Sequence, residues 1–137
     1  MTKNTAVFTV HKVGEVTGDT WAGSFELKLI LTGRERLFLD NYRKSLLVGA
    51  GDNSESAYLL AWGAAASAAR IVSAPDWWKT SNNGLDFADF DVVTEVYNQI
   101  STIVDKFEVE RMKKVNEAKK AVEKALDQAD KEEKEEK

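Results

Sequence analysis

The amino-acid sequence has no cysteine, one proline, one histidine and no long apolar run in its 137 residues. The lack of cysteine excludes disulfides, thiol nucleophiles and thiolate metal sites. The longest apolar stretch, residues 57–69, is too short for a membrane-spanning helix, which needs ~20 residues. The first five residues carry no apolar export signal. We therefore expect a cytoplasmic protein that does not bind a membrane.

Sequence motifs for catalysis are missing as well. His11 lies in a predicted strand, and a Ser-His-Asp triad would have to use this one histidine. There is no Gly-x-Ser-x-Gly elbow, and residues 49–51 (Gly-Ala-Gly) lack the remaining spacing and the Lys-Ser/Thr of a phosphate loop. We expect a protein that is not an enzyme and needs no cofactor.

The charge is moderate, with a formal net value of -4. The excess negative charge lies in residues 71–104, which carry one lysine and five acids, whereas the segments on either side are nearly balanced. No basic stripe is present to neutralise nucleic-acid phosphates. We therefore expect no nucleic-acid partner.

The N-terminal part predicts a β-hairpin. Residues 5–13 are rich in β-branched and aromatic side chains, and residues 17–20 (Thr-Gly-Asp-Thr) have the chemistry of a turn. Residues 21–31 then alternate with a period of two, which is typical of a half-buried strand. The residues expected on one face are Trp21, Gly23, Phe25, Leu27 and Leu29.

Two helices are predicted to follow the hairpin. The first covers roughly residues 33–47 and begins with a capping box formed by Thr32 and Glu35. The second is capped by Asn53 or Ser54 and continues to about residue 73, before Pro75 ends it. Alanines around a glycine in this second helix indicate close contact with another helix.

A long helix is predicted after a cap at Asp89 or Asp91. Its apolar residues are spaced alternately by three and four, which is a heptad-like pattern. They are Val93, Val96, Ile100, Ile103 and Phe107, followed after a gap by Val115, Ala118, Val122, Ala125 and Ala129. Residues 131–137 have no apolar side chain, and we expect them to be solvated and frayed.

The predicted fold is mainly α with a small N-terminal β-hairpin, a compact helical body and a long C-terminal helix. Residues 1–110 form the body, and residues 111–137 form a charged helical extension. The heptad-like stretch also permits self-association, although a seam rich in alanine pairs weakly.

Two local features have alternative interpretations. The acidic residues Asp86, Asp89 and Asp91 offer oxygen ligands for a divalent cation, but acids at a helix start are also typical caps. We favour capping and expect no metal. The adjacent Trp77 and Trp78 are either a hydrophobic plug that locks a loop or an aromatic anchor for a partner.

Three phrases in the sequence resemble one protein family. They are Ser-Ala-Pro-Asp-Trp-Trp at residues 73–78, Asn-Gly-Leu-Asp at 83–86 and an acidic helix start ending in Val-Tyr at 91–97. Together with Gly-Asp-Thr-Trp-x-Gly-x-Phe at 18–25, they are similar to the tail assembly chaperones of long-tailed bacteriophages. The resemblance covers roughly residues 14–110.

The resemblance implies a largely helical, non-enzymatic protein of the host cytoplasm that is absent from the mature virion. Such proteins bind the tape-measure protein, a very long helical chain, until tail tube subunits polymerise around it. On this hypothesis, the partner-binding residues are Trp77, Trp78, Val96, Ile100, Ile103 and Phe107. The tail tube protein is a second possible partner. The alternatives are a structural tail or neck component retained in the virion, and a small metal-dependent hydrolase that uses the three aspartates.

Overall fold

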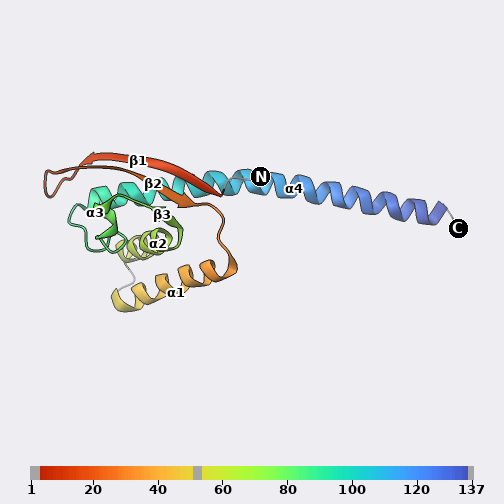
Figure 1. The fold of residues 1–137 in the computed structure, drawn as a ribbon. Coiled ribbons are helices and arrows are strands. Elements are labelled where there is room, and N and C mark those ends of the chain that lie inside the picture. The colour runs from red at the N-terminus through yellow and green to blue at the C-terminus, as the bar shows by residue number, and fades with distance from the viewer. Residues whose placement is uncertain (1–3, 51–53, 136–137) are drawn as a thin grey trace. The chain divides into compact units, whose positions relative to one another are not determined.

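A computed structural model describes residues 4–50 and 54–135 of the chain. They fall into two units, Met1–Ile103 and Val104–Lys137, which are considered separately. Figure 1 shows the order of the elements along the chain. The elements are β1 (Thr5–Val13), β2 (Thr20–Lys28), α1 (Gly33–Ala50), α2 (Glu55–Arg70), β3 (Ile71–Ser73), α3 (Asp76–Lys79) and α4 (Phe90–Glu135). The predicted fold class is confirmed.

The hairpin of β1 and β2 is confirmed, with antiparallel pairing in which Phe8 faces Phe25. These two rings stack with their centroids 4.8 Å apart. Side chains on the inner face of the hairpin are buried, as the period of two predicts. A lone hairpin is marginally stable in water, so the buried face has to pack against the helices of the same unit.

The sheet has a third strand that the sequence did not predict. Helix α2 ends at Arg70, not near residue 73, and β3 pairs antiparallel with β2 through Leu27 and Ile71. The Arg70 guanidinium donates hydrogen bonds to the carbonyl oxygens of Lys28 and Leu29, at 3.1 and 2.9 Å. These contacts with the end of β2 favour an extended chain directly after Arg70, so the helix ends well before the proline.

The predicted capping box at the start of α1 is confirmed. The Thr32 N–H donates to Glu35 Oε1 at 3.0 Å, and the Glu35 N–H donates to Thr32 Oγ1 at 3.2 Å. The Lys28 ammonium donates to Glu35 at 2.6 Å. This lysine, followed by the Thr32 N–H, lowers the pKa of Glu35 to about 2. At the next helix, Ser54 is the cap, and the alternative Asn53 lies outside the described residues.

Helix α2 approaches the early part of α4 very closely at Gly63. A Cβ atom at this position would overlap the ring of Tyr97. Tyr97 is itself buried, and its hydroxyl donates to the carbonyl oxygen of Asn83 at 2.6 Å. The alanines that surround Gly63 in α2 are buried too, which confirms that this helix makes close contacts within the first unit.

The second unit contains the later part of α4. The unit begins at Val104, whereas the sequence placed the start of the extension at residue 111. The chain stays helical through residues 131–135, where fraying was expected, while residues 136–137 lie outside the described residues. Within the described ranges, no helix is long and apolar enough to cross a membrane.

We predict that Gly63→Ala destabilises the protein, because the added methyl group overlaps a buried ring that a hydrogen bond holds in place. Overpacking costs about 1–3 kcal/mol, and an overlap with a ring atom belongs to the upper part of this range, above the ~1 kcal/mol that alanine gains over glycine in a helix. The urea midpoint should fall. Gly33→Ala is the matched control, because no atom lies within 4 Å of its added Cβ. An unchanged or higher midpoint for Gly63→Ala would show that the two helices can separate freely.

Candidate functional site

The buried side chain of Asp89 binds the turn of the hairpin and does not cap α4 as predicted. Its Oδ1 accepts hydrogen bonds from the N–H groups of Val16 and Thr17, both at 2.9 Å. Its Oδ2 accepts from the Thr17 hydroxyl at 2.6 Å and from Trp21 Nε1 at 2.7 Å. Two residues further on, Asp91 accepts from the Glu15 N–H at 3.2 Å. The aspartates therefore join the start of α4 to the β1–β2 turn.

These hydrogen bonds keep Asp89 ionised. Desolvation by burial raises the pKa of Asp89, but the bonds from Thr17, Trp21 and Val16 outweigh it and lower that pKa to about 2. The turn can come this close because residue 14 is glycine. A Cβ there would overlap the Asp89 carboxylate.

The acidic cluster does not assemble as a metal site. Asp86 is exposed, whereas Asp89 is buried and uses both oxygens on the hairpin turn. Within residues 4–50 and 54–135, no group of three or more His, Cys, Asp or Glu side chains is placed to hold a metal ion. The structure therefore offers no support for the metal-dependent hydrolase hypothesis.

The burial and contacts of the tryptophan pair match the hydrophobic-plug interpretation. Trp78 is only 3% exposed, and its Nε1 donates to Ser67 Oγ at 3.1 Å. Trp77 is half-buried, and its Nε1 donates to the Ala22 carbonyl oxygen at 3.0 Å. Both rings lie against Phe25, with centroids 5.7 Å away. The expectation that Trp78 anchors a partner therefore has to be revised, because its ring already fills the core.

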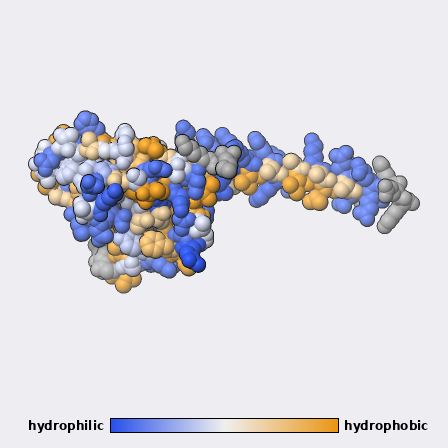
Figure 2. Space-filling model, viewed as in Figure 1, coloured by the Kyte–Doolittle hydropathy of each residue, from blue (hydrophilic) through white to orange (hydrophobic). Residues whose placement is uncertain are grey.

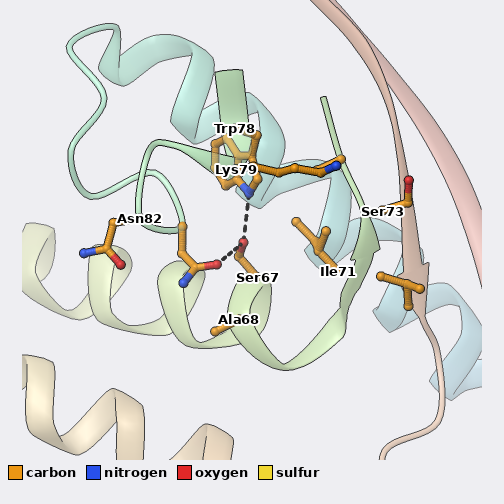
Figure 3. A pocket seen from close by; sticks show the side chains of 10 residues that line it. Ser67, Ala68, Ile71, Ser73, Trp78, Lys79 and Asn82 are labelled. Atoms are coloured by element: carbon orange, nitrogen blue, oxygen red, sulfur yellow. Dashed lines mark hydrogen bonds between the residues drawn. The ribbon is translucent and has the colours of Figure 1, made fainter. Parts of the chain in front are cut away.

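A pocket of about 300 Å³ opens beside Trp78, between the end of α2 and the loop after α3 (Figure 3). Ser67 is the most nucleophile-like residue in it, but its hydroxyl accepts from Trp78 and donates to Asn83 at 3.1 Å. Lys79 is the only ionisable residue among the described residues of the lining, and its ammonium lies 4.0 Å from Asp76 with no hydrogen bond to Ser67. The described residues of the pocket are not arranged as a nucleophile hydrogen-bonded to a base.

The predicted binding residues on α4 differ in their burial. Val96 and Ile100 are at most 1% exposed and belong to the core of the first unit, so their expected contact with a partner also has to be revised. Ile103 and Phe107 are half-buried. In the folded state, only these two and Trp77 keep part of their surface free for a partner.

The second unit carries a line of apolar side chains, which we call the apolar stripe: Val115, Ala118, Val122, Ala125 and Ala129. Val115 is half-buried, and the other four are exposed. Val122, in the middle of the stripe, is 58% exposed. Leu126 lies beside the stripe and is 61% exposed, although its position falls outside the heptad-like spacing. Figure 2 shows these apolar side chains in a line with hydrophilic ones beside them.

A second exposed apolar group lies on the first turns of α2 and was missed in the sequence. Tyr58, Leu59 and Trp62 all face solvent there. Their spacing of one and three residues places them on one side of a helix, and this signal was present in the sequence. The neighbouring alanine run drew attention to the buried side instead.

Comparisons with known proteins give no match. No protein family, no curated protein and no solved structure matches the chain.

We predict that Asp89→Asn lowers stability at neutral pH, because an amide cannot accept all four hydrogen bonds as a carboxylate does. A carboxyl group with a depressed pKa stabilises the fold fully above its unfolded-state pKa of ~3.9. For Asp89 this contribution is lost as the pH falls toward its folded value of about 2. The gap between the urea midpoints of wild type and variant should therefore narrow between pH 4 and pH 2.

The control for this prediction is Asp86→Asn, because Asp86 is an exposed aspartate three residues away. Its midpoint should stay close to that of the wild type throughout the pH range. A gap between wild type and Asp89→Asn that stays constant down to pH 2 would mean that the charge of Asp89 is not what holds the turn.

Proposed function

We propose that the protein is a non-enzymatic tail assembly chaperone that binds a phage tape-measure protein in the host cytoplasm. It keeps this helical client soluble until tail tube subunits polymerise around it, and it does not remain in the virion. The observation that carries the proposal is the apolar stripe, whose residues from Ala118 to Ala129 are exposed.

The stripe has the chemistry needed to hold a helical client. Apolar residues spaced by three and four present one face of a helix, and such a face pairs with the apolar face of another helix. Small side chains such as Ala118 and Ala125 let two helix axes come close together. Charged residues elsewhere on the second unit keep the rest of its surface in water.

The first unit suits the same function because it gives the binding helix a folded base. Its aromatic residues are used mostly in internal packing, and the Ser67 hydroxyl in the pocket beside Trp78 is already hydrogen-bonded to Trp78 and Asn83. A holdase needs a stable body and exposed apolar surface, but it needs no reactive group. The resemblance in residues 14–110 to phage tail assembly chaperones supports the identity of the client.

We predict that the tagged protein, purified from cells that are assembling the phage, brings the tape-measure protein with it. Val122→Glu should reduce this capture about tenfold or more, because a charge would lie in the apolar contact. Glutamate is a better helix former than valine, so the helix itself should persist. The readout is quantitative mass spectrometry of the captured proteins.

The matched control is Val109→Glu, because Val109 lies on the same helix, away from the stripe, and is also 58% exposed. It should capture as much tape-measure protein as the wild type. Purified phage particles should contain none of the protein. Its recovery in stoichiometric amounts from finished particles would instead identify a structural tail or neck component.

A further inference from the structure

The charges of the second unit are distributed unevenly along the helix. Residues 104–125 carry seven lysines and arginines and five acids, whereas residues 126–137 carry three lysines and six acids. Residues 104–125 therefore have a formal charge of +2 and residues 126–137 a formal charge of -3. Two such helices attract each other when they run in opposite directions, and they place like charges together when they run in the same direction.

The residues that flank the apolar stripe disfavour the parallel arrangement in particular. When Val115, Val122 and Ala129 are assigned to the a positions of a heptad, Lys114 falls at g and Lys119 at the following e. In a parallel pair, Lys114 of one helix faces Lys119 of the other. Two ammonium groups would therefore lie together on each side of the interface. An antiparallel pair avoids this contact.

The composition of the stripe fits close but weak pairing. Ala118, Ala125 and Ala129 have small side chains, which permit a short distance between helix axes. Only Val115 and Val122 add larger apolar groups, so little area is buried per turn. Such a pair dissociates readily, because its interface is small. An isolated helix is still less stable than the paired one, because most helical stability in proteins comes from packing of the apolar face.

We infer that the apolar stripe is covered by the same stripe of a second copy of this chain, in an antiparallel helix pair. A second copy in this orientation accounts for three observations: the uneven charge along the helix, the lysines beside the stripe and the small side chains within it. The pairing does not depend on the identity of any client. If the proposed chaperone function holds, the pair is the resting form, and a client helix displaces the second copy.

Spin labels test the direction of pairing in the full chain. The chain has no cysteine, so Lys113→Cys and Asp127→Cys each introduce one unique attachment point, and both side chains are exposed. The midpoint of the pair lies at residue 122, nine residues from the first label and five from the second. An antiparallel pair should therefore give a distance between the two copies' labels that is about 10 Å longer at position 113 than at 127, from a rise of 1.5 Å per residue. Equal short distances would show a parallel pair, and the absence of a dipolar signal would show no pair; either result overturns the inference.

Sedimentation of the purified chain without phage proteins tests the surface and the electrostatics. The Kd for self-association should rise with salt, because the attraction is between opposite charges. Val122→Glu should raise the Kd about tenfold or more, whereas Val109→Glu should leave it within about twofold. A chain that stays monomeric at every concentration, or a Kd that falls with salt, contradicts the inference. Neither result affects the capture experiment, so the two proposals fail separately.

Discussion

The hydrogen bonds to Asp89 are the constraint on which the first unit depends. A hairpin of two strands does not hold itself in water, and its turn is more than 70 residues away from the carboxylate that binds it. Burying a carboxylate is unfavourable unless hydrogen bonds compensate for the lost water. Four donors from the turn and from Trp21 do so, and Gly14 leaves the space in which they meet.

Several residues that the sequence suggested for partner binding are used in the interior of the first unit. Trp78, Val96 and Ile100 fill the core, and Tyr97 packs into the space left by Gly63. Side chains used in this way cannot also face a partner while the fold is intact. The second unit has the reverse character, because its apolar residues are too few to form a core of their own. They gain burial only from another helix.

The sequence predicted the parts of the fold that obey local rules. The alternation in residues 21–31 and the Thr32–Glu35 capping box both follow local rules. The capping box is confirmed, and the alternation appears in the burial of the side chains, although the strand itself ends at Lys28. Strand β3 has only three residues, too few to display a period, and its pairing with β2 comes from distant contacts.

The candidate site was predicted less well, for a related reason. The position of Asp89 at the start of a helix predicted a cap, but the groups that donate hydrogen bonds to its side chain lie far away in the chain. Val96 and Ile100 have the spacing of a docking seam, which is also the spacing of a helix face in a core. The spacing of apolar residues identifies the apolar side of a helix. The burial of those residues in the structure then distinguishes a side that packs in the core from a side that is free to dock. The stripe from Val115 onward was predicted as a seam, and it is exposed from Ala118 to Ala129.

The distribution of aromatic residues gives the two units different optical signatures. Trp21, Trp77 and Trp78 lie close together, with ring centroids 5.5 and 6.2 Å apart in successive pairs, and all belong to the first unit. The second unit contains no tryptophan or tyrosine. The tryptophan and tyrosine bands of near-ultraviolet circular dichroism therefore report on the first unit alone, while the far-ultraviolet helix signal includes both. Melting curves recorded in the two regions of the spectrum separate the loss of the body from the loss of the charged helix.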